Sequence, residues 1–477
     1  MNSRFTSFAS IALFVVMLES CFLFPIGPDA VTVFSPSLEW VKSTKGIAID
    51  INSLGYITSA GNTNEGSSLR SVVETFDAQG NLLISDISSS ESGVIRDVVA
   101  NYAGKGDFAL LKDYPINGSR NYLTTFDYIT TNPYTKYNTY TGLPDKEPYP
   151  WSYGTEALGP SIAKAQKLYA EEQFVNFVNK YHYYSSWVVG SFTDSFRPTI
   201  GNSSGYTIFD NACPTLGKAD CFVLLQDKNR RPLSVRHQWG GPENDLAYDV
   251  ASDTVTGNAT IFLRAGTPFP ITSATQSLVN VQTGYNIVRL DTNGLLTETF
   301  PVSLQATGEL TDTQIALGKG GAVYILARDN VKKQYFLAKV SRSGTQWIRY
   351  FPTAVADYDN YVPLNRTPRM GLTTDSKDCA YITGQFHGTV DLHGASLSSE
   401  SLQALVAKYS PSGSCLGALA MGSGMGVTVR LSPQEDALYV NGWAAGSIMG
   451  TSIPSQDMPR QGILRPGAFL VKLKLTK

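Results

Sequence analysis

Two histidines and an aspartate lie in one short stretch, ITGQFHGTVDLHGASLSSESLQALVAKYSPSG, which runs from Ile382 to Gly413. His387, Asp391 and His393 are residue types that proteins use for proton transfer and metal binding. The same stretch ends in an apolar run, LVAKYS, and the turn-forming residues PSG. It is therefore either a catalytic segment or one copy of a structural repeat, and the rest of the chain decides between the two.

A pattern related to this stretch recurs along the chain. In each copy an aromatic residue is followed three positions later by a small one, with a weaker copy at Phe108. The other copies begin at Tyr56, Trp187, Phe262, Tyr324, Tyr381 and Tyr439. Each copy also holds an apolar strand that ends in a polar turn, at Asp77, Asp127, Asp227, Asp291, Ser341 and Ser410. An Asp or Ser at this point accepts hydrogen bonds from the turn backbone. Because strand-like and turn-like segments alternate within each copy, we predict four strands joined by turns per copy.

The last copy is incomplete at the C-terminus, where FLVKLKLTK has no following turn or strand. A matching strand occurs near the start, because SLEWVKS (Ser37 to Ser43) is similar to TQWIRYF, with Trp40 in the place of Trp347. Pairing the first strand with the last would remove the open sheet edges. The sequence thus predicts an all-β fold, a seven-bladed β-propeller over residues 31–477 closed by an N-terminal strand.

The segment Tyr381 to Gly413 resembles the bacterial SBBP-type, or seven-bladed, β-propeller repeat, which shows YVTG, a small loop, FVAKL and a D-x-x-G turn. RHQWGGPENDLAYDVASD (Arg236 to Asp253) resembles the linker W-x-x-x-GG-x-x-x-D of that family. The resemblance covers roughly the C-terminal half of the chain. It implies a scaffold and carries no catalytic residues, so we interpret His387 and His393 as loop residues of a repeat.

An insertion interrupts the repeats, because Asp127 and Asp227 are 100 residues apart whereas Asp77 and Asp127 are 50 apart. We assign the insertion to residues 143–182, between blades two and three. The aromatic part runs from Tyr128 to Gly154, and a helix is expected from Ser161 to Tyr181. Exposed tyrosine and tryptophan are typical of protein and sugar contacts. The candidate ligand-binding residues are therefore Tyr134, Tyr137, Tyr140, Tyr149 and Trp151.

The N-terminus has the pattern of an export signal: Arg4, an apolar run from Ile11 to Leu18, and then Glu19, Ser20 and Cys21. Leu18 to Cys21 resembles a lipobox of the spirochaete type. We expect a lipoprotein signal peptide at 1–20, lipidation (palmitate or a similar chain) at Cys21, and a tether at 21–30. Simple secretion is the alternative.

Four cysteines remain after Cys21, and an even number in an exported protein permits disulfides. The pairing we consider first joins Cys213 to Cys221 and Cys379 to Cys415. It is one of three connectivities, and buried free thiols are the alternative.

Other chemistry finds little support. The net charge of −2 gives no footprint for nucleic acid, and the absence of HExxH and CxxC motifs leads us to expect no metal or other cofactor. Gly201 to Gly205 matches the G-x-S-x-G nucleophile motif, but it lies between strand-like segments, which favours a turn. Asp357, Asp359 and Asn360 lack the rest of a calcium loop, so we interpret them as a solvated loop.

These features predict a lipid-anchored binding or interaction protein of the bacterial outer membrane, facing the periplasm or the cell surface. Its ligand would be a protein or a carbohydrate, and the oligomeric state is not indicated. Two alternatives stay open: a propeller-type lyase or hydrolase with a site at the central channel, and a periplasmic scaffold for envelope assembly. A channel site would combine residues of several blades, which linear motifs do not reveal.

Overall fold

The computed structural model divides into two units, residues 1–33 and Phe34–Lys477, and only the second contains residues that the structure describes. The described ranges are 34–65, 68–87, 94–100, 108–115, 122–129, 157–165, 185–192, 195–196, 199–202, 205–208, 213–227, 232–253, 255–306, 308–352, 370–454, 456–457, 464–465 and 467–475.

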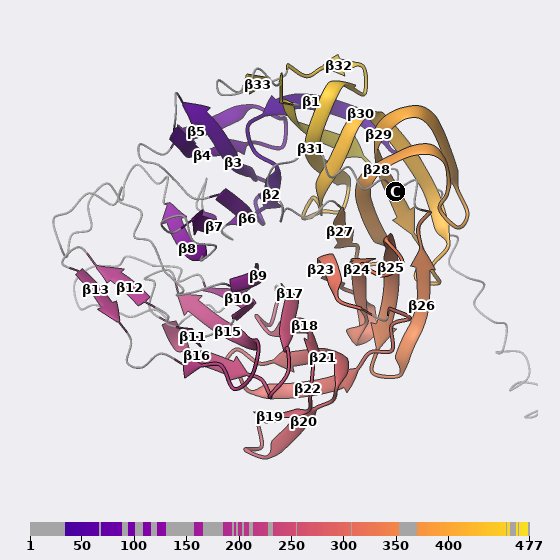
Figure 1. Ribbon diagram of the computed structural model, residues 1–477. Coiled ribbons are helices and arrows are strands. Elements are labelled where there is room, and N and C mark those ends of the chain that lie inside the picture. Colours follow the sequence, from indigo (N-terminus) through magenta and orange to yellow (C-terminus); the bar gives the residue numbers. More distant parts are fainter. Residues whose placement is uncertain are drawn as a thin grey trace, which may run out of the picture. The chain divides into compact units, whose positions relative to one another are not determined.

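The described part of the chain is all-β, as the turn-rich composition predicted, and its strands pair antiparallel with their sequence neighbours (Figure 1). The first sheet consists of β2 (Ala48–Ile51), β3 (Ile57–Glu65), β4 (Ser68–Phe76) and β5 (Leu82–Ile87). The second consists of β6 (Val94–Ala100), β7 (Phe108–Pro115) and β8 (Tyr122–Ile129).

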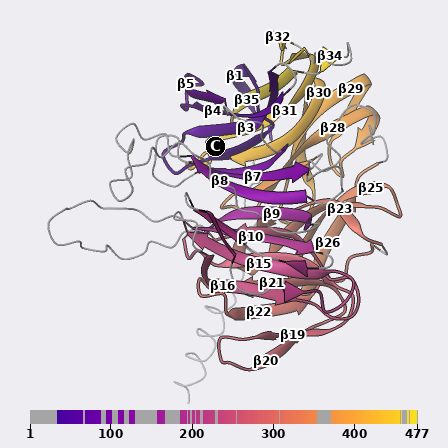
Figure 2. The ribbon, with the colours of Figure 1, turned by 60° about the vertical axis from the view of Figure 1, so that its left-hand side comes forward.

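Three four-stranded sheets follow, and the first two have small strand pairs beside them (Figure 1), of which Figure 2 shows β19 and β20. The third sheet is β9 (Ala157–Ala165), β10 (Ser185–Phe192), β15 (Asp220–Asp227) and β16 (Pro232–Trp239), with β11 (Ser195–Phe196) paired to β14 (Cys213–Pro214) and β12 (Thr199–Asn202) to β13 (Gly205–Ile208). The fourth is β17 (Leu246–Ser252), β18 (Ala259–Ala265), β21 (Gly284–Leu290) and β22 (Leu296–Pro301), with the hairpin β19 (Phe269–Thr272) and β20 (Leu278–Val281). The fifth is β23 (Leu310–Leu317), β24 (Val323–Asp329), β25 (Gln334–Ser341) and β26 (Gly344–Tyr350), with a short 3-10 turn at Lys319–Gly321.

The last sheet has eight strands because β30 (Cys415–Leu431) is 17 residues long and pairs with β29 through its first half and with β31 through its second. Its other strands are β27 (Gly371–Thr374), β28 (Ala380–Asp391), β29 (Ser396–Tyr409), β31 (Ala437–Ile448), β32 (Thr451–Ser452), β35 (Gly467–Lys474) and β1 (Ser37–Thr44). A separate small pair joins β33 (Gln456–Asp457) to β34 (Leu464–Arg465).

The pairing of β1 with β35 confirms the predicted partnership of the first and last strands. Trp40 lies opposite Lys472, as Trp347 lies opposite Lys339 in the fifth sheet, and both outer strands carry a one-residue bulge just before the tryptophan. The match between Trp40 and Trp347 therefore extends to the local backbone.

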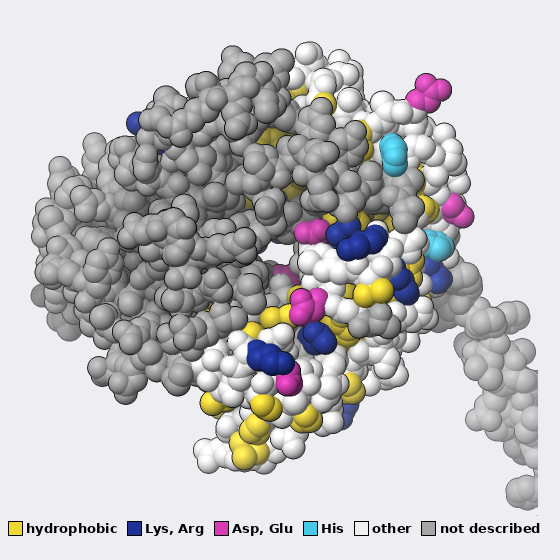
Figure 3. All heavy atoms as spheres, in the orientation of Figure 1, with side chains coloured by type: hydrophobic (Ala, Val, Ile, Leu, Met, Phe, Trp, Pro, Cys, Tyr) yellow, Lys and Arg dark blue, Asp and Glu magenta, His cyan; other side chains and the backbone are white. Residues whose placement is uncertain are grey.

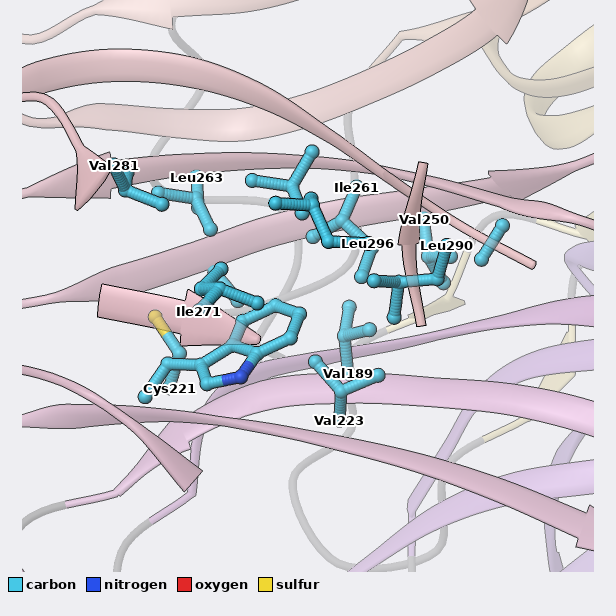
Figure 4. Packing of buried hydrophobic residues seen from close by; sticks show 14 of the residues in the cluster. Val189, Cys221, Val223, Val250, Ile261, Leu263, Ile271, Val281, Leu290 and Leu296 are labelled. Atoms are coloured by element: carbon cyan, nitrogen blue, oxygen red, sulfur yellow. The ribbon is translucent and has the colours of Figure 1, made fainter. Parts of the chain in front are cut away.

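The core of the described chain lies between consecutive sheets, where apolar side chains of neighbouring sheets pack together. Figure 4 shows one such layer, where Val189 and Val223 of the third sheet meet Ile261 and Leu290 of the fourth. Equivalent clusters join the fourth sheet to the fifth, the fifth to the β27–β30 strands, and the β31–β35 strands to the first sheet. Another joins the first sheet to the second. Apolar burial of this kind is the main stabilising term of the fold.

The predicted helix is wrong at its start. Ser161 to Ala165 belongs to β9 and pairs with β10, while residues 166–181 lie outside the described part. β9 is the edge strand of its sheet, and the ladder has a bulge next to Pro160, which is where a sheet tolerates proline. Pairing with β10, which the local sequence pattern does not reveal, makes this segment a strand and not a helix.

The predicted turn starts are confirmed at Asp77, Asp291 and Ser410, whose side-chain oxygens accept backbone N–H groups two or four residues on. Asp127 is a wrong assignment, because it lies inside β8 opposite Leu110. The second sheet therefore does not follow the repeat as closely as the later ones.

The aromatic repeat has a consistent register in four copies. Trp187, Tyr324, Tyr381 and Tyr439 each lie opposite the residue at the same place in the neighbouring strand: Leu225, Lys339, Lys408 and Lys472. In the first and fourth sheets this place belongs to Thr58 and Thr260, so the aromatic residues assigned there, Tyr56 and Phe262, are offset by two. A shift of two keeps a strand residue on the same face, which is why the sequence pattern did not reveal the offset.

Candidate functional site

Near the end of the third strand, Arg289, Lys339 and Lys472 each reach a turn of the next sheet. The ammonium of Lys339 lies 2.5 Å from Asp378 Oδ2, and the two side chains are 7% and 12% exposed. The Lys339 ammonium also lies 5.4 Å from the centre of the Tyr324 ring. The other oxygen of Asp378 accepts the backbone N–H of Lys319. This ion pair ties the fifth sheet to the β27–β28 turn of the next.

A tryptophan accompanies this lysine. Trp347 Nε1 donates to the Pro411 carbonyl at 2.8 Å, and the Lys339 ammonium lies 3.4 Å from the same oxygen. The indole packs flat on the turn, because a Cβ added to Gly413 would come within 2.7 Å of it. We call this set, Lys339 and Trp347 on the turn at Pro411, the internal clamp.

The same arrangement of a lysine, a tryptophan and a turn carbonyl recurs where β1 pairs with β35. Lys472 donates to the Ala78 carbonyl at 2.9 Å, and Trp40 Nε1 to the same oxygen at 3.4 Å. A Cβ on Gly80 would lie 2.9 Å from the Trp40 ring. Lys472 also forms an ion pair with Glu39 of β1 at 2.8 Å. We call Lys472 and Trp40 on the turn at Ala78 the terminal clamp.

Two histidines also join neighbouring elements. His393 has a φ of +65°, its backbone N–H donates to Asp391 Oδ1, and its ring Nε2 lies 3.0 Å from the Tyr350 carbonyl of the fifth sheet. His237 Nε2 lies 2.8 Å from the Gly294 carbonyl, and burial lowers the pKa of that imidazole. Since a carbonyl only accepts, Nε2 carries the hydrogen in both. His387 is an exposed residue of β28. The contacts of His393 agree with the interpretation of the histidines as parts of a repeat.

A set of polar residues on the first strands of the sheets was not predicted. Asp50 of β2 accepts the backbone N–H of Ala100 in β6 at 2.8 Å. Asp249 of β17 accepts that of Ile315 in β23 at 2.7 Å, and Gln314 accepts that of Leu372 in β27 at 2.9 Å. Each hydrogen bond crosses from one sheet to the next, so these side chains link the first strands of neighbouring sheets.

Asp97 of β6 is the member of this set with a strongly perturbed charge. Burial raises the pKa of the Asp97 carboxyl to about 7, and the nearby charges of Asp249 and Asp50 raise it further, while Arg430 and a hydrogen bond from the Val98 N–H oppose the shift. Arg430 Nε is 3.6 Å from Asp50 Oδ1. The Asp97 side chain remains partly exposed although protein surrounds it closely.

We call Asp50, Asp97, Asp249 and Arg430 the inner-strand cluster. It combines β2, β6, β17 and β30, whose residues are up to 380 positions apart, so no linear motif contains it. The only sequence signal is an aspartate within the first few residues of three such strands. A carboxyl that titrates near neutral pH beside a guanidinium can exchange a proton or hydrogen-bond a small polar ligand. Acidic and basic side chains are interspersed over the face in Figure 3.

No metal centre emerges from the part of the chain that the structure describes, where no three His, Cys, Asp or Glu residues are grouped to hold an ion. No helix among the described residues is long and apolar enough to span a membrane.

The predicted disulfides do not form in the structure. Cys221, Cys379 and Cys415 are buried free thiols, which excludes both proposed pairs, and burial raises the pKa of the Cys379 thiol to about 11. Cys379 immediately precedes β28 and Cys415 begins β30, but β29 lies between those strands. Two strand spacings amount to about 9.5 Å, beyond the reach of a disulfide.

The serine motif is confirmed as part of a hairpin, since Asn202 ends β12 and pairs with Gly205, the first residue of β13. Several other predicted sites fall outside the described residues, so their placement is not part of this structure. They are Cys21, Tyr134, Tyr137, Tyr140, Tyr149, Trp151, Asp357, Asp359 and Asn360.

No protein-family model and no curated protein matches the sequence. Solved structures that align over most of the chain include the polysaccharide lyase Uly1 (10% identity, TM-score 0.42, 97% of this chain and 95% of that one). Others are Drosophila Semaphorin 2a (8%, 0.35, 94% and 76%) and the NanB sialidase of Streptococcus pneumoniae (12%, 0.35, 92% and 71%). These similarities are too low to carry an argument about function.

Proposed function

We propose that residues 31–477 form a seven-bladed β-propeller. Its blades would be the five smaller sheets and the two halves of the eight-stranded sheet, which share β30. The apolar clusters between consecutive sheets and the pairing of β1 with β35 support this arrangement. In a propeller the first strands line the channel, where the inner-strand cluster would lie.

We infer that the protein is a binding or interaction protein of the bacterial envelope, held in the outer membrane by a lipid on Cys21. The observation that carries this is the use of the repeat's reactive side chains. Lys339, Asp378 and His393 are all engaged in joining sheets, so the repeats serve as a scaffold. Ligand recognition then falls to the insertion, with Tyr134, Tyr137, Tyr140, Tyr149 and Trp151 as the proposed contacts for a protein or carbohydrate.

The anchor is tested by fractionating cells that produce wild type or Cys21→Ala, with protease added to intact cells. The proposal expects wild type in the membrane fraction and Cys21→Ala released. Digestion on intact cells would place the propeller at the surface, and protection would place it in the periplasm. Equal partitioning of both chains would contradict the lipid anchor.

The binding role is tested by alanine substitution of the five aromatic residues, with capture on glycan and envelope-protein arrays as the readout. We expect loss of the wild-type capture pattern without a change in melting temperature. An unchanged pattern would remove these residues from the proposal and favour a scaffold for envelope assembly.

The inner-strand cluster favours a second candidate, a lyase or hydrolase with its site at the channel. Asp97, ionising near neutral pH, has the property needed in a general acid or base. Purified protein would be assayed on a panel of polysaccharides and esters between pH 5 and pH 9. Activity that disappears in Asp97→Asn would support this candidate, and turnover that Asp97→Asn retains would oppose it.

A further inference from the structure

The turns that join first to second and third to fourth strands lie at one end of the sheets, since neighbouring strands are antiparallel. The contacts between sheets show that these ends coincide. Trp187 reaches the Gly257 carbonyl of the next sheet, Arg289 the Gly321 carbonyl, and Ser376 bonds Glu435. The two clamps continue the series. We call this end of the described sheets the turn face.

The chain enters the described structure at the turn face. The backbone N–H of Phe34 donates to the Leu416 carbonyl, two residues into β30, and β1 begins three residues later. The residues between Cys21 and Phe34 are few enough that, even fully extended, they span only about 40 Å. Whatever holds Cys21 therefore lies within that distance of Phe34.

Exposed apolar side chains lie on the turn face at the start of β1 and on the first sheet beside it. They are Leu54 in the β2–β3 turn (60% exposed), Leu82 (52%) and Leu83 (46%) at the start of β5, and Leu38 (39%) at the start of β1. β1 and β5 lie side by side (Figure 1, Figure 2), and the Trp40 ring of β1 packs on Gly80 of the turn before β5. We call these four leucines the apolar rim.

The repeat provides an internal comparison for the rim. The hydrogen bonds of the β2–β3 and β27–β28 turns correspond residue by residue, which places Leu54 in the position of Lys377. The strand registers place Leu82 and Leu38 in the position of Thr345, opposite the residue before the turn. Leu83 takes the bulge position of Gln346.

The corresponding positions at Lys377, Thr345 and Gln346 thus hold polar residues where the rim holds leucine, whereas Leu296, at the position of Leu82 in the fourth sheet, is a buried leucine. The repeat geometry therefore does not require leucine at these positions. Single exposed apolar residues are common on soluble proteins, but several at one end of one sheet indicate a contact surface. Of the other large exposed apolar residues described, Val255 also belongs to the turn face, whereas Leu216, Leu278 and Val331 are in connections at the opposite end.

We propose that the apolar rim rests on the lipid bilayer to which the N-terminus is anchored, with the turn face toward the membrane. This inference rests on the proposed lipid anchor at Cys21. Each leucine side chain that enters the interface removes apolar surface from water and so strengthens attachment to the membrane.

The test uses the full chain with its own N-terminus and a Cys213→Ser background, reconstituted in vesicles. Single cysteines replace Leu54 or Leu83 on the rim and Leu278 or Val331 at the opposite end. Each carries a fluorophore that reports polarity, and the vesicles contain spin-labelled lipid as a quencher. We expect about threefold stronger quenching at the rim positions, because a surface contact reaches only ~5–10 Å into the bilayer.

Fractionation of the unlabelled chain separates the two claims. A membrane-bound chain with equal quenching at all four positions overturns the rim while leaving the anchor intact. A rim that is shielded from water-soluble quencher but not reached by the lipid quencher also overturns it, because a protein then covers the surface. A chain that stays soluble overturns both claims.

A variant built from the repeat's own residues provides the control for folding. Leu54→Lys, Leu82→Thr and Leu83→Gln together copy Lys377, Thr345 and Gln346, so the sheet should retain its melting temperature. The proposal expects this variant to leave the membrane fraction in 1 M salt or mild carbonate more readily than wild type, by about tenfold. A matched set, Leu216→Lys, Leu278→Thr and Val331→Gln, should behave as wild type, and equal behaviour of the two sets would contradict the rim.

Discussion

The internal and terminal clamps both join neighbouring sheets through a lysine and a tryptophan that donate to a turn carbonyl, but the surroundings of the two clamps differ. In the internal clamp Lys339 has a buried carboxylate partner on the next sheet, and Trp347 makes a 2.8 Å hydrogen bond. In the terminal clamp Lys472 meets its carboxylate, Glu39, on the adjacent strand of its own sheet, and the Trp40 bond is 3.4 Å long. The comparison teaches that a charged group becomes costly to disturb when its partner belongs to another sheet and water is excluded.

The largest expected effect is at Asp378. Asp378→Ala removes the partner of a buried ammonium and leaves Lys339 uncompensated, which typically costs about 3–5 kcal/mol. Glu39→Ala, the matched change at the terminal clamp, should cost under about 1 kcal/mol because Glu39 is about one-third exposed. Urea unfolding of both variants measures the difference. Equal losses would show that the two clamps do not differ as described.

The tryptophans should follow the same order. Trp347→Ala removes a ring that packs on Gly413 and contacts Tyr324, with an expected loss of about 3–5 kcal/mol. Trp40→Ala should cost less, since its hydrogen bond is longer. Thermal unfolding followed by near-UV circular dichroism would report both. A greater loss of stability for Trp40→Ala than for Trp347→Ala would contradict this order and would mean that the terminal clamp stabilises the fold more than the internal clamp.

The inner-strand cluster is a third join between sheets, and it should respond to pH. The folded Asp97 carboxyl has a pKa of about 7, above its ordinary value of 3.8, so the folded state favours the neutral form. As pH rises above about 4 the unfolded chain ionises first, and wild type loses stability until the folded carboxyl also ionises near pH 7. Asp97→Asn does not ionise, so its stability relative to wild type should grow by about 2 kcal/mol between pH 5 and pH 8.

Melting temperatures of wild type and Asp97→Asn at these two pH values test the claim. Asp253→Asn, in the β17–β18 turn, serves as the control for removing a carboxylate away from the inner-strand cluster. A difference between wild type and Asp97→Asn that stays constant with pH would mean that Asp97 ionises normally.

The smallest effect concerns the turn glycines. Gly413→Ala and Gly80→Ala both place a side chain on a residue with φ near +80° and against an indole ring. Each should lose about 1–2 kcal/mol by backbone strain, with further loss where the ring cannot move. Gly55 also has a positive φ but nothing within 4 Å of an added Cβ, so Gly55→Ala isolates the strain alone. If all three variants lose the same amount, the indole contacts contribute nothing.

The sequence was informative where the determinants are local. The turns at Asp77, Asp291 and Ser410 could be predicted because the side chain that accepts the turn's hydrogen bonds belongs to the turn itself. The strand of Trp40 could be predicted because Trp347 has the same position in the corresponding bulged strand of the fifth sheet. The helix at Ser161 failed because a neighbouring strand decides the conformation of β9. The Cys379 and Cys415 pair failed because strand order, which spacing does not reveal, places β29 between them. The inner-strand cluster required the sheets to be assembled before its members came near one another.

The most direct test of the fold's closure is a disulfide between the first and last strands. Ser37 and Lys474 are partners in the β1–β35 ladder, and both lie near the ends of the described chain. In Ser37→Cys/Lys474→Cys we predict a disulfide under mild oxidation in the native protein and an increase in unfolding free energy of at least about 3 kcal/mol, because the bond closes a very long loop. Ser37→Cys/Lys319→Cys, which combines β1 with the 3-10 turn between β23 and β24, should not cross-link. A Ser37→Cys/Lys474→Cys chain that cross-links only after partial unfolding, or not at all, would contradict the pairing of the chain's two ends on which the account depends.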